Sequence, residues 1–321
     1  MTDPLEATRD QDLVYALAAS PAFERDGLCF AARRTGLYRS QDGGQTWQSA
    51  YSSLGLTAPL PTAAVALSPD LADQTLFAGV PGAILRSGDG GRRWCPTSLP
   101  TPPPFVTSLA ISPDFVRDGT VLAGTMEDGV FRSGDRGVHW AAWNFGLLDL
   151  SVLCLAISPA FADDETVFAG TDSGIFCSTN GGRAWREVDF PADLAPVLCL
   201  ALSPDYASSG RLFAGTESNG LYVSPDRGRS WTRLGEGAIE GAVNTLNLSA
   251  EFPARPEMLV SLANAILVSR DAGQTWSEWN PDFDTRQGIT AVAAPLGLGP
   301  GAPLLVGLAD GQIVSIRPRP A

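Results

Sequence analysis

The chain has 321 residues, of which 44% are hydrophobic, 22 are basic and 35 are acidic, so its formal net charge is −13. This length is typical of two or three ordinary domains or of one array of repeats. The acidic balance argues against a nucleic-acid partner and against an anionic membrane surface, because both are bound through clustered cations. It is compatible with a cationic peptide, a metal ion or a neutral sugar.

Targeting signals are absent from the sequence as it stands. No stretch approaches the roughly 20 apolar residues of a membrane-spanning helix, so we expect no membrane insertion. Residues Met1–Glu6 form neither a basic nor an apolar region of a secretion signal. We therefore expect a cytoplasmic protein, or a secreted or periplasmic one if a leader has been removed.

One eight-residue frame, Ser-x-Asp-x-Gly-x-Thr-Trp with small variations, recurs along the whole chain at steps of 45 to 47 residues. A Ser at position 315 stands where a seventh copy would begin. The six copies are Ser40–Trp47, Ser87–Trp94, Ser133–Trp140, Ser178–Trp185, Ser224–Trp231 and Ser269–Trp276.

Each repeat contains four short β-rich runs separated by turn residues, as in Val152–Ile157, Thr166–Gly170, Ile175–Ser178 and Ala184–Val188. Repeated four-stranded units of about 45 residues are typical of β-propeller blades. The sequence therefore predicts an all-β fold, a single seven-bladed propeller of antiparallel blades over residues 1–321. The first strands are expected at Val14–Ala19, Thr62–Leu67, Val106–Ile111, Val152–Ile157, Val197–Leu202, Val243–Leu248 and Ile289–Ala294.

The last repeat ends before a fourth strand. An unpaired sheet edge invites aggregation, so we expect residues 4–8 to supply the last strand of blade seven and close the ring.

The repeated frame has the residues of a tight hairpin. Its Gly permits a positive φ, its Asp accepts N–H groups across the turn, and its Trp brings a large apolar body towards the neighbouring sheet. We expect a structural role, and no catalytic one, for the third residue of each copy: Asp42, Asp89, Asp135, Asn180, Asp226 and Asp271.

The frame resembles the Asp-box, or BNR repeat, of sialidases, sortilin-type receptors, xyloglucan-cleaving glycosidases and photosystem II assembly-factor propellers. The run Ser-Pro-Asp-Phe and the later Leu-Phe-Ala-Gly-Thr also resemble bacterial BNR-like repeat proteins of unassigned role. The resemblance covers nearly the whole chain and implies the propeller fold. It does not imply one activity, because this repeat occurs with unrelated functions.

Known catalytic patterns are not recognisable. The arginine triad, the Tyr–Glu pair and the Arg-Ile-Pro motif of sialidases are missing: Arg33 and Arg34 precede the first box, but Gly36–Tyr38 follows them. His139 is the one histidine and lies inside a box, which argues against a histidine-based triad or metal site. We expect no metal and no cofactor.

Candidate binding residues lie in the loops that do not repeat. The loops between second and third strands and those between blades are expected to share one face of the ring. They carry acidic residues and the two tryptophans outside the boxes, where sugars could stack or cationic peptides could bind. The alternative is that these are solvated turns with aromatics packed between blades. The candidates are Glu127, Asp128, Trp143, Asp172, Glu217, Trp279 and Asp310.

These observations favour a non-catalytic binding platform for a protein or peptide partner, in which a rigid ring presents variable loops. The alternative function is a carbohydrate-binding or glycoside-hydrolase-like propeller that uses the acidic and aromatic loops, with a glycan as ligand. A third hypothesis, implied by the resemblance alone, is a subunit or assembly factor of a larger complex.

Overall fold

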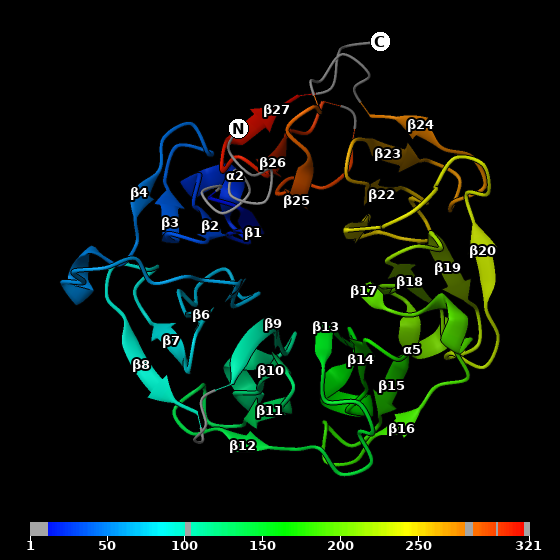
Figure 1. Cartoon of the computed structure of the whole chain (residues 1–321), viewed down its shortest axis with the longest axis horizontal. Helices are drawn as coiled ribbons and strands as arrows, with labels where there is room; N and C mark the ends of the chain where they lie inside the picture. Colours follow the sequence, from blue (N-terminus) through cyan, green and yellow to red (C-terminus); the bar gives the residue numbers. More distant parts are fainter. Residues whose placement is uncertain (1–11, 100–103, 280–284, 300, 318–321) are drawn as a thin grey trace, which may run out of the picture.

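A computed structural model describes residues 12–99, 104–279, 285–299 and 301–317. Seven antiparallel sheets stand around a central axis, and the first blade lies beside the last (Figure 1). Six sheets have four strands, and the seventh has three among the described residues. The predicted seven-bladed propeller is confirmed. The proposed closing strand at residues 4–8 lies outside the described residues.

Within each blade, the strands run in chain order from the central axis to the outer edge (Figure 1). The first, innermost strands are β1 (Val14–Ala19), β5 (Ala64–Leu67), β9 (Phe105–Ile111), β13 (Val152–Ile157), β17 (Val197–Leu202), β21 (Thr245–Leu248) and β25 (Ile289–Ala293). The second strands are β2 (Cys29–Arg33), β6 (Leu76–Val80), β10 (Val121–Met126), β14 (Val167–Thr171), β18 (Leu212–Thr216), β22 (Met258–Ser261) and β26 (Leu304–Leu308).

The third strands are β3 (Gly36–Ser40), β7 (Ala83–Ser87), β11 (Gly129–Ser133), β15 (Ile175–Ser178), β19 (Leu221–Ser224), β23 (Ile266–Ser269) and β27 (Ile313–Ile316). The fourth, outer strands are β4 (Gln48–Ser49), β8 (Cys95–Ser98), β12 (Ala141–Ala142), β16 (Arg186–Glu187), β20 (Thr232–Leu234) and β24 (Ser277–Glu278). Short helical turns occur at α2 (Phe23–Asp26), α3 (Phe115–Asp118), α4 (Phe161–Asp164), α5 (Tyr206–Ser209), Ser52–Leu54 and Ala192–Leu194.

The second strand of each blade is the core of the fold, because its residues are almost all buried. In five blades this strand contains a Gly that faces a Val within two residues of the start of the next blade's first strand. A Cβ at any of these glycines would lie 2.5–2.8 Å from an atom of that Val. The pairs are Gly79–Val106, Gly124–Val152, Gly170–Val197, Gly215–Val243 and, across the junction of last and first blades, Gly307–Val14.

Each box is a hydrogen-bonded hairpin turn. In the first box the Ser40 hydroxyl donates to Asp42 at 2.7 Å and accepts the Gly44 N–H. Asp42 also accepts the N–H groups of Gln45 and Thr46 and the Thr46 hydroxyl. In blade 4 the side chain of Asn180 accepts the Ser178 hydroxyl and the N–H of residue 184 in the same way. In each box, side-chain oxygens thus accept backbone N–H groups of the turn.

We predict that Gly215→Ala lowers the free energy of unfolding by about 1–3 kcal/mol, because the new methyl group would overlap the buried Val243. The matched control is Gly88→Ala, since no atom lies within 4 Å of a Cβ there, and its effect should stay within about 0.5 kcal/mol. Urea unfolding monitored by tryptophan fluorescence measures both. Equal effects of the two variants would contradict this account of the blade contact.

We also predict that the box carboxylates make the fold sensitive to acid. The Thr275 hydroxyl, the Thr275 N–H and the Ser269 hydroxyl lower the pKa of Asp271 to about 2. Because this folded-state pKa lies below the unfolded value of about 3.9, the stabilisation is present above about pH 4 and is lost as the pH falls towards 2. Unfolding measured from pH 7 to 2 should show that Asp271→Asn is less stable at neutral pH and loses less on acidification.

Asn180→Asp is the reciprocal variant, because it places a carboxylate in the one box that lacks it. It should make acid unfolding steeper than in the unmodified chain. If neither variant changes the pH dependence, the box hydrogen bonds do not couple protonation to folding.

Candidate functional site

The second-to-third-strand loops and the inter-blade connections emerge on one face, here called the loop face; the boxes and the first-to-second-strand loops emerge on the other, the box face. This follows from the strand order of every blade. Glu127 and Asp128 lie between β10 and β11, Asp172 between β14 and β15, Glu217 between β18 and β19, and Asp310 between β26 and β27.

The connection from blade 3 to blade 4, residues 143–151, is held between the loops of both blades. The Asn144 side chain donates to the Asp128 carbonyl at 2.8 Å and accepts the Val130 N–H at 2.8 Å. The Leu150 carbonyl accepts the Gly129 N–H. We call this segment the 3/4 connection. Its backbone therefore has a defined position, although the segment contains no strand.

Asp149 joins the 3/4 connection to blade 4. Its carboxylate accepts the N–H of Ser173 at 2.8 Å and the N–H of Ser151 at 3.0 Å. Partial burial acts to raise the pKa of Asp149, but the hydrogen bonds from Ser173, Ser151 and Thr171 outweigh it, so the pKa lies below its usual value. Asp149 thus stays ionised and brings the connection next to Asp172, the neighbour of Ser173.

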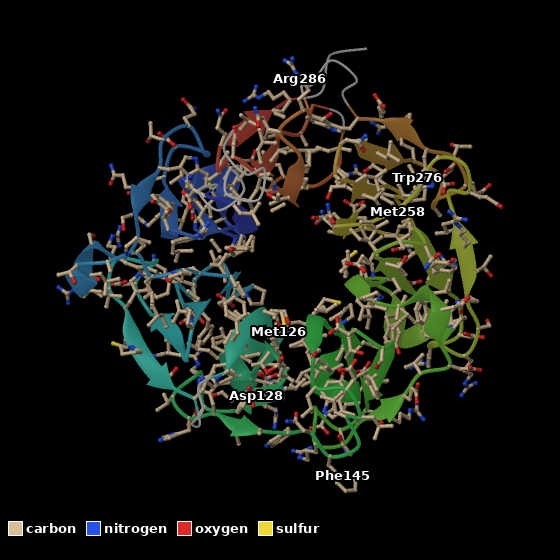
Figure 2. The ribbon with its side chains drawn as sticks, viewed as in Figure 1. Met126, Asp128, Phe145, Met258, Trp276 and Arg286 are labelled. Carbon is tan, nitrogen blue, oxygen red and sulfur yellow. The ribbon has the colours of Figure 1, made fainter. Side chains whose placement is uncertain are left out.

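Large apolar side chains are exposed on the 3/4 connection and on blade 3. Phe145 is 81% exposed and Leu148 is 78% exposed. Phe105 and Met126, which pair across β9 and β10, are exposed as well. Figure 2 shows Met126 towards the centre of the ring, Phe145 at its outer edge and Asp128 at an intermediate distance from the centre. We call the set the 3/4 surface: Phe105, Met126, Glu127, Asp128, Phe145, Leu148, Asp149, Leu150 and Asp172.

The two tryptophans do not join this surface, contrary to the expectation that they share the loop face with the carboxylates. The Trp143 ring lies 4.3 Å from the Arg132 guanidinium carbon and 5.2 Å from that of Arg183, so the attraction between cations and the ring face turns it towards the box of blade 4. Trp279 is half-buried and packs against the core of blades 6 and 7.

Glu217 and Asp310 lie on other blades of the loop face. The Glu217 side chain is exposed, and its N–H donates to the Pro196 carbonyl. The Asp310 carboxylate accepts the N–H of Gln312 within its own turn. The structure therefore brings Glu127, Asp128 and Asp172 together with the 3/4 connection and leaves the other candidates apart.

Several residues of the 3/4 connection escaped the sequence reasoning, notably Asn144, Leu148, Asp149 and Leu150. The available signal was three leucines in a connection without a strand pattern, Leu147–Leu150, since connections are usually polar. Among the described residues, no group of three His, Cys, Asp or Glu side chains could hold a metal ion. None of the described helices has both the length and the apolar character needed to cross a membrane.

Asn144→Ala should release the 3/4 connection, because it removes both side-chain bonds and leaves the Val130 N–H without its acceptor. Hydrogen exchange should become faster at Gly129, Val130 and Leu147, with little change in overall stability. Phe145→Ala removes an exposed ring and should leave these amides unchanged. Unaltered exchange in Asn144→Ala would show that the connection is held by other contacts.

Comparisons with known proteins agree with this architecture. The model of the BNR/Asp-box repeat matches residues 38–49. No curated protein shows significant similarity in sequence. The GH74 xyloglucanase from Xanthomonas campestris is similar in structure, with a TM-score of 0.73 and 19% identity over 96% of this chain and 52% of that enzyme. This chain therefore spans about half the length of the xyloglucanase.

Two structures of YCF48 are similar over nearly their whole length. YCF48 bound to D1 peptide has a TM-score of 0.68 and 17% identity, covering 95% of this chain and 93% of that one. YCF48 from Cyanidioschyzon merolae has a TM-score of 0.69 and 14% identity, with 95% of each chain covered. At these identities the likeness concerns the fold. The chain is a seven-bladed β-propeller that carries the BNR/Asp-box repeat.

Proposed function

We propose that this propeller is a non-catalytic binding platform that docks a protein or peptide segment on its 3/4 surface. The observation that carries the proposal is the exposure of Phe145 and Leu148 on a connection that hydrogen bonds hold in place. A preordered apolar surface loses little conformational entropy on binding. Exposed apolar patches on a folded chain are typical of interaction sites.

The chemistry of the surface selects a basic, amphipathic partner. Glu127 and Asp128 follow the exposed Met126 in the β10–β11 loop. Asp172 neighbours Ser173, whose N–H donates to a carboxylate of the 3/4 connection. The formal net charge of the chain is −13. Opposite charges speed the encounter and set the orientation, while buried apolar side chains supply most of the affinity. A segment with Leu, Ile or Phe side chains flanked by Lys or Arg meets both requirements.

The structural comparisons support a peptide ligand. YCF48 bound to D1 peptide is a propeller of nearly the same extent as this chain, so a single ring of this size can act without a second domain. We propose, by this analogy, that the chain serves as a subunit or assembly factor of a larger complex.

The carbohydrate alternative rests on the likeness to the GH74 xyloglucanase. The Trp143 ring, which could have stacked on a sugar, already lies against two guanidinium groups, and Trp279 packs against the core. These contacts favour the peptide. Hydrolysis of xyloglucan that is abolished by a single change at Glu127, Asp128, Asp172 or Glu217 would overturn the non-catalytic proposal.

Selection from a library of displayed 12-residue peptides tests the docking surface. We expect the selected peptides to combine basic and apolar residues, and Phe145→Ala with Leu148→Ala to weaken their binding about tenfold or more. Asp128→Asn with Asp172→Asn should weaken binding and reduce its dependence on salt. The measurement is isothermal titration at two ionic strengths.

Leu296→Ala is the matched control for this experiment, because Leu296 is exposed but belongs to blade 7 on the box face. It should bind the selected peptides as the unmodified chain does. Peptides without a basic and apolar bias, or peptides that bind the Phe145/Leu148 variant normally, would contradict the proposal.

A further inference from the structure

A buried aromatic side chain fills the junction between most neighbouring blades on the box face. It is the third residue after the Ser that begins the first-to-second-strand loop, and at three junctions it packs edge-to-face on an aromatic ring in the second strand of the preceding blade. Three such pairs, with ring centroids 5.7–5.9 Å apart, are Phe115 on Phe77, Tyr206 on Phe168 and Phe252 on Phe213.

Blade 2 departs from this pattern. From Ser68 to Leu76 its loop is one residue shorter than the loop from Ser112 to Val121 in blade 3, and it forms no helical turn. The corresponding residue, Leu71, is 64% exposed instead of buried. In the described part of the chain Phe30, which occupies the place of Phe77, has no aromatic ring against it.

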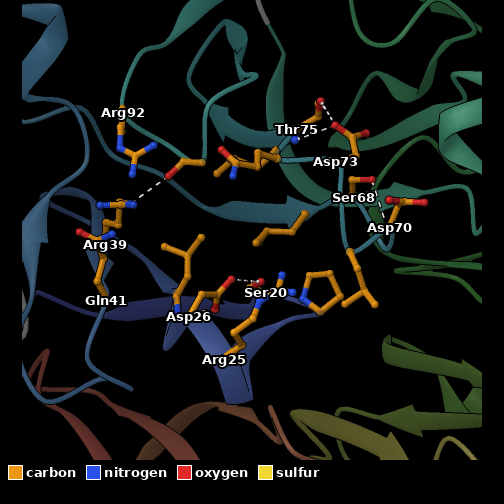
Figure 3. Close-up of a pocket in the computed structure, with 17 residues that line it drawn as sticks. Ser20, Arg25, Asp26, Arg39, Gln41, Ser68, Asp70, Asp73, Thr75 and Arg92 are labelled. Carbon is orange, nitrogen blue, oxygen red and sulfur yellow. Dashed lines mark hydrogen bonds between the residues drawn. The ribbon is translucent and has the colours of Figure 1, made fainter.

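A cavity lies beside this shortened loop. It has a volume of about 140 Å³, lies between blades 1 and 2 and is lined by Leu28, Leu67 and Leu76. A second hollow of about 280 Å³ adjoins it. Arg39 and Arg92 line both spaces. Figure 3 shows these two arginines at one end of the cavity.

Arg39 and Arg92 lie together at one end of the cavity (Figure 3), where Asp89 and Asp26 partly offset the charge of Arg39. Arg39 donates through Nε to the Gly90 carbonyl at 2.8 Å, which leaves its two terminal nitrogens without a hydrogen-bond partner in the described chain. Burial, and after it the charge of Arg92, lowers the pKa of Arg39. The two guanidinium groups therefore repel each other, and a negative group between them would relieve this repulsion.

The cavity is also lined by three carboxylates, of which Asp70 and Asp73 lie at the end away from Arg39 and Arg92 (Figure 3). Asp26 accepts the Ser20 hydroxyl at 2.7 Å and the Leu28 N–H at 2.9 Å. One oxygen of Asp73 accepts the N–H and the hydroxyl of Thr75, while its other oxygen is buried without a hydrogen bond, 3.8 Å from the Arg136 guanidinium. Among the described residues, neither Asp26 nor Asp73 forms an ion pair with Arg39 or Arg92. The cavity thus combines a pair of arginines at one end with a few leucines in an otherwise polar lining.

We propose that the cavity between blades 1 and 2 binds a small organic anion. Its acidic group bridges Arg39 and Arg92, and its apolar body lies on Leu28, Leu67 and Leu76. Arginine suits this role because its planar group donates paired hydrogen bonds to a carboxylate or phosphate. The site lies on the box face, and it is independent of peptide docking at the 3/4 surface.

Titration of the full chain with benzoate, hexanoate and octanoate tests the site by calorimetry and ligand-observed NMR. At least one of them should bind saturably at up to about 10 mM, in the range typical of small fragments. Benzyl alcohol, which lacks the charge, should bind at least about tenfold more weakly. Arg92→Gln and Arg39→Gln should each lower the affinity by about tenfold or more.

Arg93→Gln is the matched control, because Arg93 follows Arg92 in the same box but does not line the cavity. It should leave the affinity unchanged. Replacing residues 68–75 with the blade 3 sequence Ser-Pro-Asp-Phe-Val-Arg-Asp-Gly-Thr should restore the aromatic side chain, raise the melting temperature and abolish binding.

Three outcomes would overturn the proposal. The first is the absence of saturable binding for all three anions. The second is equal loss of affinity in Arg92→Gln and Arg93→Gln, which would indicate a general effect of charge. The third is unchanged binding after the loop replacement in a chain whose circular dichroism shows it to be folded.

Discussion

The ring depends on the close approach of a valine to a glycine in the preceding blade. The five Gly–Val contacts leave no room for a methyl group, so the distance between neighbouring sheets is set by the absence of a side chain. Dispersion forces and the burial of apolar surface then act over the whole blade interface. The contact of Gly307 with Val14 joins the last blade to the first, so the same interaction that stacks the blades also closes the ring.

The boxes stabilise the turns within each blade, whereas the Gly–Val contacts join one blade to the next. They satisfy the polar groups of a turn at the outer edge with side-chain oxygens, as Ser40 and Asp42 do. Blade 4 keeps this turn with Asn180, so the geometry of the acceptor matters for folding more than its charge. The repeated residues are thus occupied with the scaffold, and the binding proposals fall on loops that differ between blades.

The sequence was sufficient to predict the propeller, because the boxes recur at steps of 45 to 47 residues and strand-rich units of that length form blades. It also placed Asp128 and Asp172 in loops. It could not predict that Trp143 turns to Arg132 and Arg183, since those arginines belong to other segments and meet the ring only in the folded chain. For the same reason the sequence could not predict the hydrogen bond from the Ser173 N–H to the Asp149 carboxylate.

The shortened loop of blade 2 shows how a rigid repeat protein can acquire diversity. A loop that is one residue shorter, with Leu71 in the position of the aromatic residue, leaves this junction without its ring, while the strands on both sides keep their pairing. The side chains at one blade junction can therefore change without disturbing the other junctions. Evolution, or a protein engineer, could alter another junction by the same two changes and vary its chemistry through the side chains around it.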